Sequence, residues 1–421
     1  MKRRSFLLAA IGVAAGAWWL RPADRGRGGH DGYFAGLSEA LKREGLARPT
    51  LVIDLDRLDA NIAATTRAMK PREFRVVAKS LPAAALLDYV MQRAGTRRLM
   101  VFHQPFLNAV AAAHPGTDLL LGKPMPAAAA HRFYEHLQPG DFDPTRQVQW
   151  LIDSPERLRQ YRELAEALDT KLTINVEIDV GLRRGGMKQP ADLVRLLAVI
   201  DQDPRLRFGG LMGYDAHAAL PETLNLRARE FEQVEARYRG FLQAWREHAG
   251  GRGEEELVLN AAGSPTYRMW DGIDGLANEL AVGSGLVKPL DFDIDTLTEH
   301  VPALFIGSPV LKVEEGLELP AIDLGPLHQL WDPNRARTFF VYGGYWKAEP
   351  VSPRGLATHP VYGRSTNQEM LNGSRQVELA VDDTVFFRPT QSEFVMLQFG
   401  PIAAVRAGRV VDFWEPLPQI A

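Results

Sequence analysis

The sequence predicts an α/β protein built as a closed (β/α)8 barrel followed by a separate all-β domain. Eight short apolar or β-branched runs alternate with amphipathic helical stretches between residues 75 and 283. Such strict alternation implies parallel strands, and eight parallel strands favour closure into a barrel. After about residue 300 helical periodicity nearly disappears and short strand-like runs with turn residues take its place, which predicts the second domain.

An opening helix (Gly36–Glu44) and a strand (Thr50–Leu55) are expected before the repeating pattern begins. The alternative to a barrel is an open doubly wound sheet, which usually carries a Gly-x-Gly-x-x-Gly turn after its first strand. No such turn follows Arg75–Lys79. The eight expected barrel strands are Arg75–Lys79, Arg98–Phe102, Asp118–Gly122, Val148–Asp153, Leu172–Asp179, Phe208–Tyr214, Glu256–Ala262 and Asn278–Gly283.

We expect three regions: an N-terminal signal and connector over residues 1–33, the barrel over 34–300 and the β-domain over 301–421. Strands of the β-domain are expected at Pro302–Val313, Thr338–Tyr342, Gln376–Leu379, Thr384–Phe387, Val395–Phe399 and Val410–Phe413.

The first residues have the pattern of an export signal. Lys2, Arg3 and Arg4 precede an apolar stretch over Phe6–Leu20, which is short for a membrane span. The run Arg-Arg-Ser-Phe-Leu resembles a twin-arginine signal and predicts a periplasmic location. An uncleaved single-helix membrane anchor is the alternative.

Composition excludes several classes of protein. Of the 421 residues, 46% are apolar and 24% charged, the balance of an ordinary globular protein rather than a disordered, collagen-like or polytopic membrane chain. Lys and Arg number 49 against 52 Asp and Glu, and the net charge of −3 indicates no nucleic-acid or anionic-membrane partner. The chain has no cysteine, which excludes disulfides, zinc–thiolate sites, iron–sulfur clusters and cysteine nucleophiles.

Polar residues at the carboxyl ends of the strands are the candidates for an active site, because barrel enzymes place theirs there. Lys79 ends the first strand, where partial desolvation would make it a candidate amine nucleophile. The alternative is a lysine that extends from the rim into solvent. Glu177 and Asp179 share one face of the fifth strand, for direct catalysis or for structural ion pairing.

Later strand ends add groups that suit a phosphorylated cofactor. Tyr214 and His217 follow the sixth strand, where they could touch a cofactor ring or move protons, although a loop histidine is often merely solvated. Gly263–Thr266 and Gly283–Ser284 follow the seventh and eighth strands, where barrels commonly bind phosphate. Phosphate on one side and a lysine on the other describe pyridoxal phosphate (PLP).

With these motifs the sequence resembles the fold-type III PLP enzymes, an alanine-racemase-like barrel followed by a β-domain. It is most similar to the branch that holds D-threonine aldolase and D-serine dehydratase. The resemblance covers residues 45–417 and rests on Thr50–Asp54, Val77–Lys79, Val176–Gly181, Gly210–Tyr214, Gly263–Thr266, Asn278–Leu280, Gly283–Ser284 and Val410–Trp414.

The resemblance implies a role for each matching residue. Lys79 would form a Schiff base with PLP, Arg184 matches the arginine of the family's Asp-Val-Gly-x-x-Arg segment, and Tyr214 would lie close to the pyridine ring. It also implies a homodimer, in which the β-domain of one subunit faces the barrel mouth of the other. The phosphate contacts would come from Gly263, Ser264 or Thr266 and from Gly283 and Ser284.

One departure from the family concerns a divalent metal. The family's lyases hold it through a His-x-Cys or His-x-Asp pair just after a proline, whereas here Gln391 and Glu393 stand at those places. Glutamine is a poor zinc ligand, but an amide oxygen and a carboxylate could hold Mg²⁺ or Mn²⁺ weakly. The metal therefore stays open.

The resemblance implies a PLP-dependent lyase acting on D-β-hydroxy amino acids, and the missing metal ligands favour D-threonine-aldolase-like cleavage, with Glu393 or His217 as general base. The alternatives are a D-serine-dehydratase-like lyase, an amino-acid racemase with Tyr342 or Tyr345 as second base, a non-catalytic PLP-binding protein, and a pseudoenzyme retained for binding.

Overall fold

The computed structural model describes residues 21–222, 225–316 and 331–418, so the predicted export signal lies outside the described residues. These residues form two compact units. We call residues 55–303, 391–400 and 414–418 the barrel unit, and residues 21–54, 304–390 and 401–413 the β unit. Within the described ranges, no helix is both long enough and apolar enough to cross a membrane.

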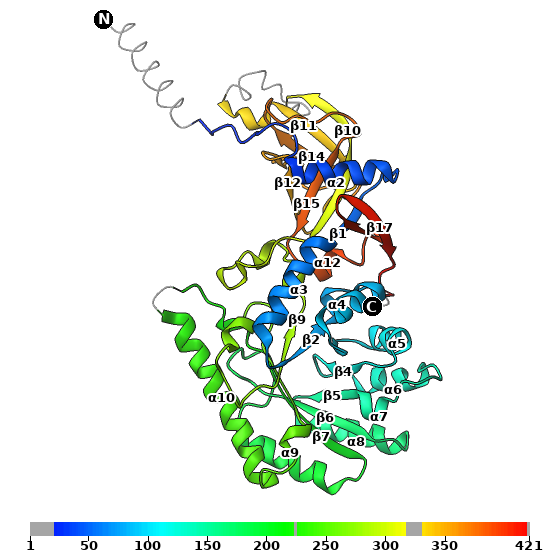
Figure 1. Cartoon of the computed structure of the whole chain (residues 1–421), viewed down its shortest axis with the longest axis vertical. Helices are drawn as coiled ribbons and strands as arrows, with labels where there is room; N and C mark the ends of the chain where they lie inside the picture. Colours follow the sequence, from blue (N-terminus) through cyan, green and yellow to red (C-terminus); the bar gives the residue numbers. More distant parts are fainter. Residues whose placement is uncertain (1–20, 223–224, 317–330, 419–421) are drawn as a thin grey trace, which may run out of the picture. The chain divides into compact units, whose positions relative to one another are not determined.

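The barrel unit contains the predicted closed barrel of eight parallel strands (Figure 1). The last strand pairs with the first, with Val282 opposite Val76, and this pairing closes the ring. All eight predicted strands are confirmed. Their bounds are β2 Glu73–Val77, β3 Arg98–Val101, β4 Asp118–Leu121, β5 Val148–Ile152, β6 Leu172–Glu177, β7 Leu206–Gly213, β8 Val258–Ala261 and β9 Glu279–Val282.

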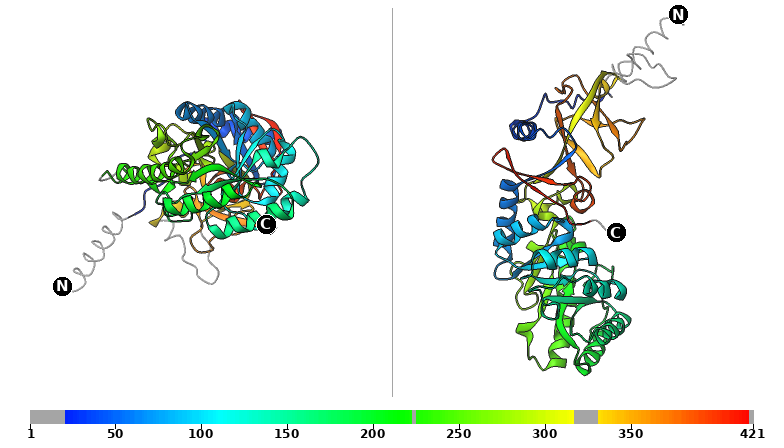
Figure 2. Two further views of the ribbon diagram at one scale, coloured as in Figure 1. Left: turned by 90° about the horizontal axis from the view of Figure 1, so that it is seen from below. Right: turned by 90° about the vertical axis from the view of Figure 1, so that its right-hand side faces the viewer.

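Helices surround the ring of strands, as Figure 2 shows from two further directions. Their ends follow local rules. For example, Ser154 caps the helix that starts at Pro155, and Gly250 ends another with φ of 63°. The helices are α3 Leu55–Met69, α4 Ala84–Ala94, α5 Gln104–Ala113, α6 Ala127–Glu135, α7 Pro144–Gln147, α8 Pro155–Ala167, α9 Pro190–Gln202, α10 Leu226–Ala249 and α12 Ser392–Val395.

A buried ionic network lies among the barrel strands near their amino ends. Arg75 has no exposed side-chain surface, and its Nη2 donates to Glu279 Oε2 at 2.8 Å and to Asp118 Oδ1 at 2.7 Å. Asn260 and Arg98 also donate to the Glu279 carboxylate, at 2.7 and 3.0 Å. Burial alone would lower the pKa of Arg75, but Glu279 and Asp118 raise it above its ordinary value. The buried charges of Arg75 and Glu279 are therefore each paired with groups of opposite charge.

Glu279→Ala should destabilise the protein by about 3–5 kcal/mol, because it leaves the buried Arg75 guanidinium without its main partner. Chemical denaturation followed by circular dichroism measures the change. Glu299→Ala is the control, because its pairs with Arg67 and Arg268 are exposed and should contribute less than about 1 kcal/mol. Equal losses in the two variants would contradict the structural role of the network.

The β unit is a nine-stranded sheet with the order β13-β14-β11-β10-β1-β16-β17, and β12 and β15 pair off this path. Helix α2 packs on it. The bounds are α2 Gly32–Arg43, β1 Thr50–Asp54, β10 Leu304–Glu315, β11 Arg337–Tyr342, β12 Ala348–Ser352, β13 Ala357–Thr358, β14 Gln368–Gly373, β15 Thr384–Pro389, β16 Ile402–Arg406 and β17 Arg409–Trp414.

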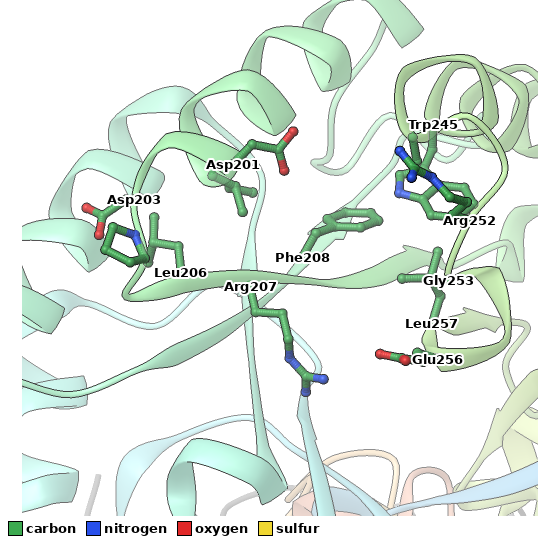
Figure 3. A pocket seen from close by; sticks show the side chains of 13 residues that line it. Asp201, Asp203, Leu206, Arg207, Phe208, Trp245, Arg252, Gly253, Glu256 and Leu257 are labelled. Atoms are coloured by element: carbon green, nitrogen blue, oxygen red, sulfur yellow. The ribbon is translucent and has the colours of Figure 1, made fainter.

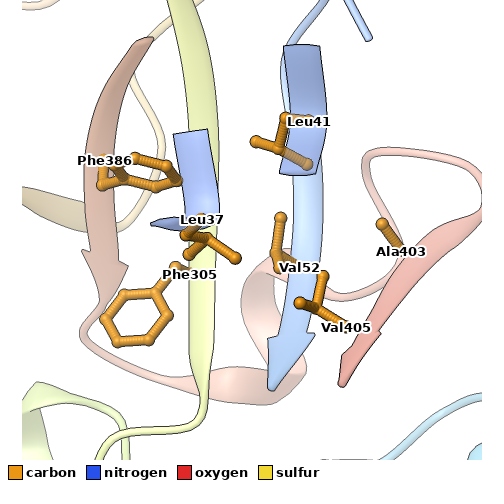
Figure 4. Packing of buried hydrophobic residues seen from close by; sticks show 7 residues of the cluster. All are labelled: Leu37, Leu41, Val52, Phe305, Phe386, Ala403 and Val405. Atoms are coloured by element: carbon orange, nitrogen blue, oxygen red, sulfur yellow. The ribbon is translucent and has the colours of Figure 1, made fainter. Parts of the chain in front are cut away.

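The core of the β unit forms where α2 covers this sheet (Figure 4). Leu37 and Leu41 come from one face of the helix and meet apolar side chains from four strands. This face is buried because its residues are four apart and share one side of the helix. The sheet residues of this cluster are Val52, Phe305, Phe386, Ala403 and Val405.

The structure corrects four expectations. Residues 391–400 and 414–418, expected with the β-domain, belong to the barrel unit. Residues 34–54, expected with the barrel, lie in the β unit, because β1 pairs with β10 and β16. Val395–Phe399 is not a strand, since Met396 N donates to Ser392 O in a helical turn. Gln376–Leu379 is also not a strand. It follows a turn from Ser374 to Val377, and one bridge to Gly28 is its β-pairing.

Candidate active site

Lys79 lies at the carboxyl end of β2, in a short 3₁₀ turn over Ala78–Ser80. Its side chain is 42% exposed, and Nζ lies 3.7 Å from Glu393 Oε1. Nζ also lies 4.8 Å from the centre of the Phe102 ring, which follows β3. The amine is therefore at the mouth of the barrel, accessible from solvent, with a carboxylate beside it.

Glu393 comes from α12, a helical turn that belongs to the barrel unit although it is far from β2 in sequence. Its Oε2 accepts hydrogen bonds from Ser284 Oγ and Ser392 Oγ, both at 3.2 Å. Ser284 Oγ also lies 3.0 Å from Ser80 Oγ. The structure thus brings three predicted site residues together, namely Lys79, Ser284 and Glu393.

The two predicted phosphate loops are joined through Ser264. Its Oγ accepts from Gly283 N at 3.2 Å and from Gly285 N at 2.9 Å. A Cβ on Gly283 would lie 2.8 Å from Val77 Cβ, closer than side chains normally pack. Glycine at this position is therefore required for the loop after β9 to approach the end of β2 next to Lys79.

Tyr214 lies against Gly263. A Cβ on Gly263 would come within 2.6 Å of Tyr214 Cε2, so the Tyr214 ring can lie here only because residue 263 has no side chain. Tyr214 is 38% exposed, and burial, followed by the charge of Asp215, raises the pKa of its hydroxyl. Arg184 is exposed in the loop after β6, and its positive charge acts to lower the pKa of the Tyr214 hydroxyl.

Thr266 is fully buried, and its hydroxyl is already engaged. It accepts from Gly263 N at 3.1 Å and donates to Asp215 Oδ1. The second oxygen of Asp215 accepts from Trp270 Nε1 at 2.7 Å. Burial raises the pKa of Asp215 to about 6, although both hydrogen bonds act to lower it. Sequence reasoning missed Asp215, whose signal was its place directly after Tyr214 at a strand end.

His217 belongs to a different group of residues from Lys79. Its Nε2 lies 3.4 Å from Glu230 Oε1, and a Cβ on Gly181 would come within 2.7 Å of the same nitrogen. Among the described residues neither ring nitrogen has a hydrogen-bond partner of good geometry. Burial lowers the pKa of the ring, which favours the neutral form.

Glu177 ends β6 and lies close to the loop that carries Arg184. Its carboxylate oxygens would be 3.5 Å from a Cβ placed on Gly185. Burial raises the pKa of Glu177 to about 7, Asp153 adds to the rise, and Arg184 opposes it. Asp179 instead accepts from Gly181 N and Arg183 N, each at 3.0 Å, and so shapes the loop.

Glu177→Gln should stabilise the protein at pH 8 by about 2 kcal/mol and leave it unchanged below pH 4.5. The native carboxyl binds its proton more tightly than the unfolded one. Stability is therefore lost as pH rises from about 4.5 to 7, and glutamine removes that loss. Thermal unfolding between pH 4 and 8 measures it, with the exposed Glu255→Gln as control. A constant difference across this range would contradict the assignment.

Among the described residues, no third ligand joins Gln391 and Glu393 at the predicted metal site. Within the part of the chain that is described, no group of three or more His, Cys, Asp or Glu residues could hold a metal ion. Gln391 directly precedes α12, and Glu393 already accepts two hydroxyls beside an ammonium group. Coordination by Gln391 and Glu393 stays a prediction.

A pocket of about 410 Å³ lies at the opposite end of the strands (Figure 3). Leu206 and Phe208 line it from the start of β7, and Leu257 from just before β8. Barrel enzymes carry their chemistry at the carboxyl ends. This pocket is therefore separate from the Lys79 group.

The residues at the mouth fit PLP. Glycines 263, 283 and 285 let two loops close beside Lys79. A Cβ on the first two would collide with Tyr214 and Val77, and one on Gly285 would lie in tight contact with Ser264, 3.0 Å from its Cβ. A reactive aldehyde requires an accessible amine, and a phosphate requires hydroxyls and backbone N–H groups at loop ends. Lys79 offers the first. In the loops, Gly283 N and Gly285 N already donate to Ser264 Oγ, and the Ser264 hydroxyl keeps its own proton to donate to a phosphate.

The fold and this mouth define an alanine-racemase-like barrel enzyme with a β-domain, of PLP fold type III. Residues 53–289 match the family described as alanine racemase, N-terminal domain, and the chain belongs to that family.

Three of the known proteins similar to this chain have names that include a D-β-hydroxy amino acid. A 3-hydroxy-D-aspartate aldolase from Paracoccus denitrificans is 24% identical over 318 residues, which cover 70% of this chain and 78% of the relative. The structure of D-threonine aldolase from Filomicrobium marinum superposes with a TM-score of 0.69 at 18% identity, over 87% and 94% of the two chains. D-threo-3-hydroxyaspartate dehydratase from Delftia sp. HT23 gives 0.68 at 18% identity, over 88% and 98%.

Proposed function

We propose that this protein is a PLP-dependent lyase that cleaves D-β-hydroxy amino acids in the manner of D-threonine aldolase. The observation that carries the proposal is the amine of Lys79 at the barrel mouth, 3.7 Å from the carboxylate of Glu393. The similarity to a 3-hydroxy-D-aspartate aldolase and to D-threonine aldolase supports this substrate class.

PLP, when bound, supplies an electron sink for the charge that develops at the substrate Cα. Lys79 would hold its aldehyde carbon, the loops of Ser264 and Ser284 its phosphate, and Tyr214 would lie beside its ring. Arg184, exposed near Tyr214 and Glu177, would supply positive charge at the edge of the site.

Glu393 is the group placed to remove the proton of the substrate β-hydroxyl. Ser284 and Ser392 donate to Oε2, which leaves Oε1, the oxygen facing Lys79, to accept that proton. As the Cα–Cβ bond breaks, the β-carbon leaves as an aldehyde and Cα gains a proton, so D-threonine gives glycine and acetaldehyde. His217 is a less direct candidate, because its neighbours are Gly181 and Glu230.

Dehydration is the second candidate, supported by the similarity to D-threo-3-hydroxyaspartate dehydratase. Expelling hydroxide requires an acid or a metal at the β-oxygen, whereas Glu393 is arranged as an acceptor of protons. The geometry therefore favours aldol cleavage. The predicted homodimer and periplasmic location are part of the same proposal.

Product analysis tests the reaction type. EDTA-treated, PLP-loaded full-length protein is incubated with D-threonine or D-3-hydroxyaspartate, with and without Mn²⁺, and the products are identified by mass spectrometry. We expect glycine from both substrates. Ammonia with a 2-oxo acid would replace aldol cleavage with dehydration, and L- or allo-threonine would indicate racemisation or epimerisation. A strict Mn²⁺ requirement would assign Gln391 and Glu393 to a metal.

A further inference from the structure

Asp215 is a buried carboxyl for which the proposed reaction has no direct use. It follows Tyr214 after the end of β7, and its side chain has no exposed surface. Each of its oxygens accepts from one neutral side-chain donor, Oδ1 from Thr266 Oγ1 and Oδ2 from Trp270 Nε1. Burying a carboxyl is costly, so such a group is retained where it holds specific partners in place.

The Thr266 hydroxyl transmits this constraint to the loop after β8. Its proton points to Asp215, so its lone pair accepts from Gly263 N at 3.1 Å. Gly263 O in turn accepts from Thr266 N and Tyr267 N, each at 3.0 Å. The turn from Gly263 to Thr266 is thus closed at both ends, with the orientation of one hydroxyl set by Asp215.

Ser264 lies at the tip of this turn and continues the chain of contacts. Its Oγ accepts from Gly283 N and Gly285 N in the loop after β9. Asp215 therefore helps to position both loops suggested for phosphate binding. It orients Thr266 in the loop after β8, and Ser264 of that loop holds the loop after β9. On the other side, Trp270 is fully buried and packs edge-on against Phe231 and Tyr238 of α10.

We propose that Asp215 is a positioning residue, which fixes the Thr266 hydroxyl and thereby the two loops that receive the cofactor's phosphate group. Thr266 itself makes no contact with the phosphate, because its proton is given to Asp215 and its side chain is sealed from solvent. This inference rests on the proposed binding of PLP at Lys79.

The test compares PLP with pyridoxal, which has the same aldehyde and ring but no phosphate. Asp215→Asn keeps the shape of the side chain, but its NH₂ group is a donor and must face one of the two donors that Asp215 accepts from, Thr266 Oγ1 or Trp270 Nε1. Because the indole N–H of Trp270 can only donate, the Thr266 hydroxyl must turn. We expect the Kd for PLP, from absorbance titration, to rise about tenfold or more, a loss of about 1.4 kcal/mol. The Kd for pyridoxal should change less than about twofold.

Thr266→Val keeps the proposal testable should Asp215→Asn fail to fold, because it removes the Thr266 hydroxyl itself and leaves Trp270 Nε1 as a donor to Asp215. It should weaken PLP selectively, and Thr266→Ser should restore most of the affinity. Glu279→Gln is the matched control, a buried carboxyl at the other end of the barrel. It should lower the thermal stability but leave the ratio of the two dissociation constants unchanged.

The possible results separate the two claims. Equal weakening of PLP and pyridoxal in Asp215→Asn and Thr266→Val would show a merely structural role and overturn the positioning proposal. Unchanged binding of both ligands would overturn it as well. Failure of the wild-type protein to bind PLP at Lys79 would instead overturn the proposed function, and this inference with it.

Discussion

Lys79→Ala is expected to abolish aldol cleavage, with a loss of more than about 10³-fold in kcat/KM. Lys79 is the lysine that the structure places at the barrel mouth with a carboxylate at 3.7 Å and an aromatic ring below its amine. The alanine side chain has no amine, so it cannot attach covalently to the aldehyde of PLP. Borohydride reduction of the PLP-loaded protein, followed by peptide mass spectrometry, should label the wild-type peptide containing Lys79.

Lys171→Ala is the control for this experiment, because that lysine is exposed just before β6, at the opposite end of the strands. It should keep its activity and its label at Lys79. Full activity in Lys79→Ala, or labelling of the wild-type protein at another lysine, would contradict the assignment.

Glu393→Gln should lower kcat for aldol cleavage by about 10²–10⁴-fold, the usual contribution of a general base. Glutamine keeps the size of the side chain and can still accept from Ser284 and Ser392, but it cannot take up the hydroxyl proton. Binding of PLP should change little. Steady-state kinetics with D-threonine measure the first effect, and absorbance titration the second.

Two further variants show which role Glu393 has. Glu135→Gln removes an exposed carboxylate on α6 and should leave kcat unchanged. Gln391→Ala distinguishes a base from a metal ligand, because its activity should fall only if Gln391 and Glu393 hold a divalent ion. A wild-type rate in Glu393→Gln would require another base, and His217 would then be the residue to replace.

The barrel was predictable because its strands are almost continuously apolar and alternate with amphipathic helices. The β-domain was less so. Residues 34–54 precede the barrel in sequence, and only long-range pairing with β10 and β16 places β1 in the other unit. Val395–Phe399 has strand-like composition, yet a local helical hydrogen bond decides its conformation.

The site shows the same limit. Strand-end positions identified Lys79, Tyr214 and the glycine loops, because the barrel rule applies to sequence directly. Glu393 was chosen by its place in a family motif, and only the structure shows its distance to Lys79. Asp215 was invisible as a partner of Thr266 and Trp270, because these residues are more than 50 positions apart.

The most direct test of aldol cleavage by the Lys79 and Glu393 pair is the reaction of D-threonine in ²H₂O, with products analysed by mass spectrometry. Aldol cleavage should give acetaldehyde without deuterium and glycine with one deuterium at Cα, since Cα gains a solvent proton after the Cα–Cβ bond breaks. Recovered D-threonine should contain no deuterium at Cα. Deuterated threonine as the main product, or 2-oxobutanoate without glycine, would contradict it.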